Sequence, residues 1–219
     1  MSTREQQNSR PSLAHVRRSH ASRSEETQRK ILDAALRVIQ AHGLQKATMT
    51  EIAREAGVSA GALQHHYGSK DILITRIIDL IFEESKPDGD IWPSVTLPVR
   101  QRAYAFVERA WQSIYGTERY LASWHLHFGV HASEALRVRL NEVRLEWDKE
   151  MTTRFLLSFP ELEACIPDPT GFARLVFSSL RGIAFLAWFG DASDKNLDQL
   201  NALAESISRV ATGHTDEGA

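Results

Sequence analysis

Residues 48–70, TMTEIAREAGVSAGALQHHYGSK, decide the fold of the N-terminal part of this 219-residue chain. Thr48 and Glu51 form the pattern of a capping box, in which the threonine hydroxyl accepts from one free amide and the glutamate reaches back to another. Gly57 ends this short helix, and Ser59 caps a second one. Two short helices joined by a tight glycine turn predict a helix-turn-helix.

The second predicted helix, from Ala60 to about His66, is the one that would enter the DNA major groove. Leu63 and Tyr67 anchor it, which leaves small and polar side chains exposed. A glutamine pairs with adenine, a histidine donates to guanine or phosphate, and small residues let the backbone approach closely. The next helix begins at Lys70, and its free amides and ammonium group suit a DNA phosphate.

Helical patterns continue on both sides of this unit. Before it, apolar residues at i, i+4 and i+7 predict a helix from Ser24 that Gly43 ends. After it, the isoleucine-rich stretch from Lys70 to about Glu84 predicts a helix that connects to the rest of the chain. Residues 1–23 are polar and arginine-rich, so we expect a disordered basic arm. The arm is either a solvated tail or a source of extra phosphate and minor-groove contacts.

Charge and aromatic content divide the chain near this connection. Residues 1–76 carry 12 Lys and Arg against 7 Asp and Glu, whereas residues 77–219 carry 14 against 21. Of the 18 Phe, Trp and Tyr residues, only Tyr67 lies in the first part. The net charge of −2 is therefore a cancellation, and the two parts are expected to have different partners. The arm supplies most of the positive excess, so the folded head is almost neutral.

Composition and motifs disfavour several other classes of protein. Cys165 is the only cysteine, which excludes an internal disulfide and a cysteine-based zinc site. No apolar run approaches the ~18 residues that a membrane helix needs, and the N-terminus carries no apolar signal segment. A cytoplasmic protein without membrane contact is expected. Enzyme motifs such as a Gly-rich phosphate loop, Gly-x-Ser-x-Gly or His-Glu-x-x-His are absent, so we expect no enzyme and no cofactor.

The stretch from ILDAA at residue 31 to DILI at residue 74 resembles the tetracycline-repressor (TetR) family of bacterial transcriptional regulators. The shared order is an Ala-Ala step, a glycine, Thr-x-x-x-Ile-Ala, Ala-Gly-Val-Ser, Gly-x-Leu, an aromatic residue and a lysine before the fourth helix. The resemblance covers roughly a fifth of the chain. It departs from many members at Gln64, where they have tyrosine, and at Ala60, where a basic residue is common.

What this resemblance implies is an all-α protein with a three-helix DNA-binding head and a helical domain for ligand binding and dimerisation. By position, it places the first residues named here near phosphates and the small residues with His65 at base edges. The expected DNA-contacting set is Thr48, Thr50, Ser59, Ala60, Gly61, Ala62, Gln64, His65, His66, Tyr67 and Lys70. Because the base-reading surface has no Arg or Lys, DNA affinity is expected to depend on the arm, helix ends and a few polar contacts.

The remaining two thirds of the chain form helical patterns after a turn-rich linker. We expect helices at 98–115, 117–131, 133–158, 170–189 and 194–212. Aromatic stripes on their inner faces form either plain core or the wall of a cavity, and the many tryptophans favour a cavity because indole N–H groups need partners. The expected ligand-contacting residues are Trp111, Tyr115, Trp124, Phe128, Trp147, Met151, Phe177, Arg181 and Trp188.

Arg181 lies within an aromatic stripe, where an arginine is costly unless it has a partner. It would hold an anionic ligand, pair with a carboxylate, or stack in a dimer interface; the sequence leaves these three open. The opposite, apolar face of the same helix and the last helix would form the four-helix dimer bundle typical of the family.

Histidines in the body suggest a metal site only weakly. His127 and His131 have the i, i+4 spacing of a chelating pair, but the sequence supplies no third ligand beyond a guess at Glu134. We therefore interpret these side chains, and His125, as surface histidines. The adjacent His65 and His66 point about 100° apart on a helix and cannot chelate together. No metal is expected.

The chain is thus expected to contain an arm (1–23), a head (24–70), a connecting helix (71–86), a ligand-binding and dimerisation domain (87–214) and a disordered tail (215–219). The favoured function is a ligand-responsive regulator, most simply a repressor, that binds a palindromic double-stranded operator as a homodimer. A small, largely hydrophobic effector would release it. The alternative is a DNA-binding protein with an inert helical body.

Overall fold

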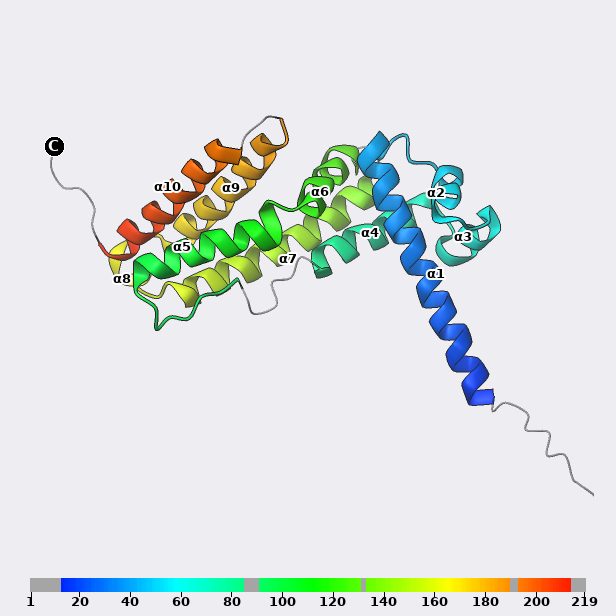
Figure 1. Ribbon diagram of the computed structural model, residues 1–219, viewed down its shortest axis with the longest axis horizontal. Helices are drawn as coiled ribbons and strands as arrows, with labels where there is room; N and C mark the ends of the chain where they lie inside the picture. Colours follow the sequence, from blue (N-terminus) through cyan, green and yellow to red (C-terminus); the bar gives the residue numbers. More distant parts are fainter. Residues whose placement is uncertain (1–12, 85–90, 131–132, 190–192, 214–219) are drawn as a thin grey trace, which may run out of the picture.

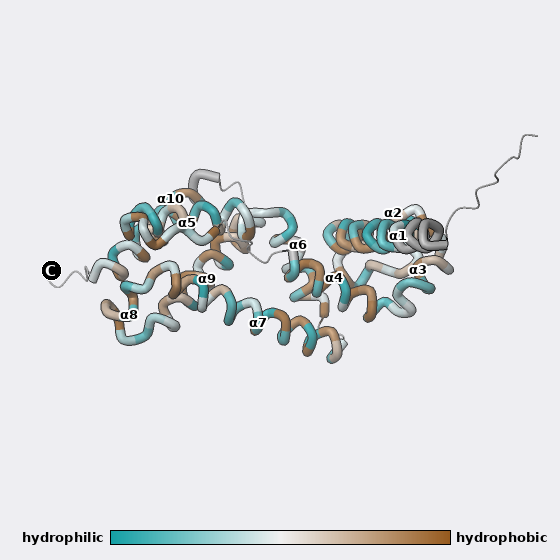
Figure 2. The backbone as a smooth tube through the Cα atoms, turned by 90° about the horizontal axis from the view of Figure 1, so that it is seen from below, coloured by the Kyte–Doolittle hydropathy of each residue, from teal (hydrophilic) through white to brown (hydrophobic). Residues whose placement is uncertain are grey.

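The computed structural model describes residues 13–84, 91–130, 133–189 and 193–213, and every regular element in these ranges is helical. This confirms the predicted all-α class. Three helices form a head at one end of an elongated molecule, and five form a body at the other, with α4 and α6 between them (Figures 1 and 2). The head helices and the connecting helix are α1 Leu13–His42, α2 Met49–Ala56, α3 Ala60–Tyr67 and α4 Lys70–Glu84.

The first helix is longer than the sequence analysis expects. It begins at Leu13 rather than at Ser24 and extends away from the head (Figure 1). Residues 13–23 contain Ala, Arg and Leu and no Gly or Pro, and these residue types favour a helix. The expectation of a disordered arm is therefore wrong for residues 13–23, and residues 1–12 lie outside the described part of the chain. As predicted, α1 ends before Gly43, whose φ of 77° suits glycine.

The helix-turn-helix has the predicted caps. The Thr48 hydroxyl accepts from the Glu51 amide at 3.2 Å, and the Ser59 hydroxyl accepts from the Ala62 amide at 3.1 Å. Gly57 ends α2 in the left-handed conformation with φ 67° and ψ 29°. The local sequence therefore fixes both the start of α3 and its angle to α2.

The second half of the capping box differs from the prediction. The Glu51 carboxylate lies 3.6 Å from His42 Nε2 and 4.0 Å from Arg54 Nη2 instead of bonding the Thr48 amide. The two cations attract the carboxylate away from the backbone. Glu51 therefore links α2 to the end of α1.

The body helices follow the predicted patterns to within a few residues, except for a short α8 that the sequence analysis does not predict. The first of them continues into a π-helical segment, η1, in which the Gly116 amide donates to the Trp111 carbonyl at 2.8 Å. Their bounds are α5 Val99–Ala110, η1 Trp111–Tyr115, α6 Glu118–Gly129, α7 Glu134–Ser158, α8 Leu162–Cys165, α9 Pro169–Ala187 and α10 Ser193–Ala211.

Two apolar cores organise the molecule. One fills the body between α5, α7, α9 and α10 and includes Phe106, Phe155 and Phe177. The other fills the head, and it also takes in Leu126 of α6 and Leu140 of α7. Because α4, α6 and α7 contribute to the head core, the head is packed onto the body rather than joined by a free linker.

Helix α9 is the one described helix that is long and apolar enough to cross a membrane, by length and composition alone. The sequence analysis counted uninterrupted apolar runs and did not find it, since Arg174 and Arg181 interrupt the run. In the structure α9 packs against α7 and α10, and Arg181 pairs with a carboxylate inside the body. These contacts are those of a core helix in a helical domain.

The apolar stripe of α10 lies on its own chain and not on an open dimer face. Leu200 and Ile207 are buried, mostly against α5. The exposed apolar side chains are instead on α9, at Leu175, Leu186 and Phe189. The predicted assignment of the α10 stripe to a dimer bundle is therefore wrong, while the exposed face of α9 remains open for a partner.

Candidate functional site

The surface expected to face DNA is built around the N-terminal end of α3. Ser59, Ala60 and Gly61 are exposed there, next to the exposed Gln64 and His65. A β-carbon added at Gly61 would have Ser59 Oγ at 3.9 Å as its nearest neighbour, so this side of the helix is open. Thr48 and Thr50 are exposed at the start of α2, and Ala62 and His66 are half-buried. The helix end and its small residues are therefore accessible to a large partner.

Three polar residues of the predicted set are engaged within the chain. Tyr67 is buried, and its hydroxyl donates to the Gln28 carbonyl at 3.3 Å. The Lys70 ammonium donates to the Leu44 carbonyl at 2.7 Å, and burial lowers its pKa. The Gln64 amide donates to a carbonyl at the end of its own helix. Phosphate or base contacts by these groups would have to replace or share these bonds.

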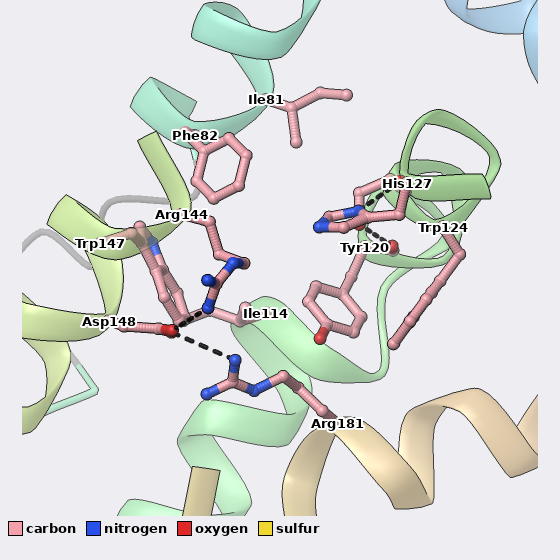
Figure 3. Close-up of a pocket in the computed structure, with 11 residues that line it drawn as sticks. Ile81, Phe82, Ile114, Tyr120, Trp124, His127, Arg144, Trp147, Asp148 and Arg181 are labelled. Atoms are coloured by element: carbon pink, nitrogen blue, oxygen red, sulfur yellow. Dashed lines mark hydrogen bonds and ion pairs between the residues drawn. The ribbon is translucent and has the colours of Figure 1, made fainter. Parts of the chain in front are cut away.

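The second candidate site is a cavity of about 260 Å³ enclosed by α4, η1, α6, α7 and α9 (Figure 3). Its wall is mostly aromatic and aliphatic, with charged groups gathered on the α7–α9 side. The connecting helix α4 supplies the end of the cavity nearest the head. The lining residues are Ile81, Phe82, Ile114, Tyr120, Ser123, Trp124, His127, Arg144, Trp147, Asp148 and Arg181.

Two arginines meet one carboxylate in this wall. Arg144 Nη1 donates to Asp148 Oδ2 at 2.9 Å, and Arg181 Nη1 forms an ion pair with Asp148 Oδ1 at 3.1 Å (Figure 3). Arg144 also donates to Asn141, and Arg181 Nε donates to the Phe177 carbonyl. Pairing with a carboxylate was one of the three roles that the sequence left open for Arg181. The cluster carries two positive charges and one negative charge.

The opposite wall is aromatic and contains hydrogen-bond donors that lack a partner. Tyr120 packs on Tyr115 with ring centroids 4.9 Å apart. The indole N–H groups of Trp124 and Trp147 and the hydroxyl of Tyr115 are buried and have no hydrogen-bond partner among the described residues. Burial raises the pKa of Tyr115 well above its ordinary value, and also that of Tyr120, so both phenols stay neutral.

His127 is part of the cavity wall. Its Nδ1 lies 2.9 Å from the Ser123 carbonyl, which only accepts, so Nδ1 carries the proton and Nε2 is an acceptor. Burial lowers the pKa of His127 and keeps the ring neutral. The interpretation of His127 as a surface histidine is therefore wrong, because α6 turns this face toward α4 and α7. His125 is also half-buried, with its ring 4.8 Å from that of Trp188.

His131 lies outside the described residues, so the proposed pair with His127 is not tested. Within the described ranges, no group of three His, Cys, Asp or Glu side chains is placed to hold a metal ion.

Comparisons with known proteins assign this architecture. Residues 31–77 match the model of bacterial regulatory proteins of the tetR family. The HTH-type transcriptional regulator BetI of Agrobacterium fabrum is 33% identical over 138 residues, 63% of this chain and 65% of the relative. The chain belongs to the TetR family. The alignment nevertheless spans less than two thirds of that relative.

Solved structures of other regulators share the fold of this TetR-family chain across both head and body. A transcriptional regulator from Rhodococcus has a TM-score of 0.65 at 20% identity, covering 85% of this chain and 96% of that one. The multidrug binding protein EbrR, solved with imidazole, has a TM-score of 0.57 at 20% identity, covering 84% and 89%. The family assignment places the chain among transcriptional regulators rather than enzymes.

The structure sorts the predicted ligand-contacting residues of this TetR-family chain into three groups. Trp124, Trp147 and Arg181 line the cavity, and Tyr115 lies directly behind its wall. The other five are elsewhere, and cavity contact from them is not supported. Met151 and Phe177 are core, Trp111 lines a groove between α5 and α10, and Phe128 and Trp188 are 55% and 40% exposed.

Several lining residues were missed because their roles depend on how helices meet. Ile81 and Phe82 belong to α4, which periodicity alone marks only as a connecting helix. Arg144 and Asp148 have the i, i+4 spacing of an ordinary surface ion pair. Their proximity to Arg181 was the available signal, since a buried arginine needs a carboxylate partner.

Proposed function

We propose that this chain is a ligand-responsive transcriptional regulator whose head binds double-stranded DNA and whose cavity binds the effector. The observation that carries the proposal is the position of α4. It begins at Lys70, directly after the recognition helix, and ends at Ile81 and Phe82 in the cavity wall. A ligand that contacts these two residues acts on the helix that sets the position of the head.

A second contact couples the head to the body. Arg139 of α7 donates to Asp79 of α4 at 2.8 Å and 3.0 Å. The Ser133 hydroxyl at the start of α7 donates to Asp71 at 2.9 Å. Both ends of α4 are therefore held by α7, whose middle carries the Arg144–Asp148 pair. Ligand binding shifts the head only as far as the effector binds one arrangement of these helices better than another.

A homodimer is the assembly in which this head would read a palindromic operator, with two recognition helices in successive major grooves. The exposed apolar side chains of α9, Leu175, Leu186 and Phe189, support a dimer face on this helix. Gly182 lies in the same stripe, where an added β-carbon meets nothing within 4 Å, so a partner helix has room to approach. Release of the operator by the effector makes the regulator a repressor.

The cavity favours this proposal over a DNA-binding protein with an inert body. An inert body would be filled, whereas this one leaves a cavity next to α4 and buries indole N–H groups without partners. The fold neighbour EbrR is itself described as a multidrug binding protein.

DNA binding is tested by fluorescence anisotropy with the region upstream of the protein's own gene. Ala60→Glu places a carboxylate at the first position of α3, where it stabilises the helix but repels phosphate. We expect at least a tenfold loss of DNA affinity without loss of folding. Ala202→Glu, at an exposed alanine of α10 in the body, is the matched control and should bind as the wild type. Absence of binding by the wild-type protein at low salt would refute the proposal.

The dimer is tested by light scattering coupled to size-exclusion chromatography. Leu175→Lys puts a charge in the exposed stripe of α9, and we expect the protein to become a monomer. Leu157→Lys, at an equally exposed leucine of α7, should remain a dimer. A dimer that tolerates Leu175→Lys would place the interface elsewhere.

A further inference from the structure

The polar groups around the cavity are predominantly donors. The indole N–H groups of Trp124 and Trp147 have no partner among the described residues, and Trp147 is only 8% exposed. Arg181 uses Nε and Nη1 for the Phe177 carbonyl and Asp148, and its Nη2 has no partner in the described part of the chain. A ligand that fits this wall must therefore supply hydrogen-bond acceptors, because a buried donor without a partner is costly.

The charges have the same sign. Arg144 and Arg181 share one carboxylate, Asp148, and His127 is neutral, so the described lining carries a net charge of +1. These three charged side chains are between 25% and 37% exposed, which weakens their solvation. An anionic ligand would balance the excess charge, and a planar carboxylate matches the planar guanidinium group in two parallel hydrogen bonds.

Size and shape restrict the remainder of the ligand. A cavity of about 260 Å³ holds the volume of about nine water molecules at about 30 Å³ each. That is below the usual range for drug-sized ligands. The walls away from the arginines are the rings of Phe82, Tyr120 and Trp124 with Ile81 and Ile114. A flat, apolar body of one ring fills such a space.

We propose that the effector of this cavity is a small carboxylate with a single ring, whose anionic group binds Arg181 and Arg144 and whose ring packs against α4 and α6. This inference rests on the proposed function, because it names the ligand class of the same site. The ring reaches Ile81 and Phe82, so the carboxylate anchors the ligand to α7 and α9 while the ring contacts α4. His127 Nε2 is an acceptor on the ring side and suits a hydroxyl substituent.

A cationic ligand is the main competitor, since aromatic rings also attract cations. Here a cation would lie beside two guanidinium groups and a single, already paired carboxylate (Figure 3). It would also leave both indole donors without an acceptor. The charge balance therefore favours the anion.

Three compounds of the same shape and different charge test the proposal: benzoate, its neutral isostere benzamide, and benzylamine, which is a cation at neutral pH. Binding to the full-length protein is measured by calorimetry and by quenching of tryptophan fluorescence. We expect benzoate to bind at least tenfold more tightly than benzamide and benzylamine not to bind. Equal or tighter binding of either comparison compound would overturn the proposal. So would failure of benzoate, 4-hydroxybenzoate and phenylacetate all to bind at millimolar concentration.

Two variants shift benzoate affinity in opposite directions, which general damage to the fold cannot do. Arg181→Gln removes one positive charge and should weaken benzoate binding at least tenfold, while changing benzamide binding less than threefold. Asp148→Asn removes the competing carboxylate and should tighten benzoate binding at least threefold. Arg137→Gln, at an exposed arginine two turns earlier on α7, is the matched control and should bind as the wild type. Weaker benzoate binding in Asp148→Asn, or none lost in Arg181→Gln, would refute the assignment.

Failure of this inference is distinguishable from failure of the proposed function. If the protein binds its upstream DNA but discriminates against carboxylates, only the ligand class is wrong. If benzoate binds with the expected charge dependence and the protein does not bind DNA, the proposed function fails and the carboxylate site stands.

Discussion

Substitution of Gly129 by alanine tests how tightly the body holds the head. Gly129 is the last residue of α6, and it packs on Leu44 in the turn between α1 and α2. An added β-carbon would overlap the Leu44 β-carbon and lie 2.9 Å from its Cδ2. Leu44 cannot retreat easily, because it is buried and its carbonyl accepts from Lys70. The methyl group therefore forces α6 and the head apart.

The size of the effect follows from two opposing terms. Overpacking a filled contact costs about 1–3 kcal/mol. Replacing a helical glycine by alanine gains up to about 1 kcal/mol in a helix interior, and less at a helix end. We expect a net loss of about 1–2 kcal/mol in the free energy of unfolding, with at least a threefold loss of DNA affinity in the absence of ligand.

Urea denaturation followed by tryptophan fluorescence measures the stability, and anisotropy with upstream DNA measures the affinity. Gly61→Ala is the matched control for stability, since its β-carbon makes only an ordinary contact at 3.9 Å in helix α3. It should be as stable as the wild type or more so. If Gly129→Ala were also as stable as the wild type and bound DNA equally well, the contact with Leu44 would not position the head.

Three further variants test other parts of the structure. Gly61→Ala should weaken DNA binding at least threefold in anisotropy while stability holds or rises, because the methyl group blocks close approach of the helix; unchanged affinity would place Gly61 away from DNA. The pKa of His127 is lowered by burial, so the unfolded chain takes up a proton near pH 6.5 that the folded chain refuses. Stability should therefore fall as the pH drops below about 6.5, and denaturation at pH 5–7.5 should show a smaller fall in His127→Gln but not in the exposed control His65→Gln. Glu161→Ala leaves the 1% exposed Arg102 without its carboxylate and should cost about 3 kcal/mol in urea denaturation. Arg102→Met should cost less, since Glu161 is 36% exposed and reaches water; the reverse order would contradict the buried-charge argument.

The head was predictable because its structure is encoded locally. Caps at Thr48 and Ser59 and the left-handed Gly57 act within three or four residues of their own positions. The start of α1 was not, since a polar stretch without Gly or Pro is compatible with both coil and helix. Composition favoured coil for residues 13–23, whereas intrinsic propensity favours helix.

The cavity was predictable only in part because it forms between helices that are distant in sequence. Aromatic spacing on one helix shows which side is buried, but not whether a side chain meets core or space. Met151 and Phe177 share their stripes with Trp147 and Arg181, yet the first two fill the core and the last two line the cavity. The difference is set by the depth at which α7 and α9 cross, which depends on side chains of both helices.

Helix α6 presents its two faces to the two candidate sites, and this arrangement carries the coupling argument. Trp124 and His127 face the cavity, whereas Leu126, Gly129 and Val130 face the head. A ligand that displaces the first pair must move the second set, because one rigid helix carries both. Helix α4 gives the same connection through Ile81 and Phe82. Two helices thus transmit any displacement at the cavity to the head, and the contact between Gly129 and Leu44 leaves no slack to absorb it.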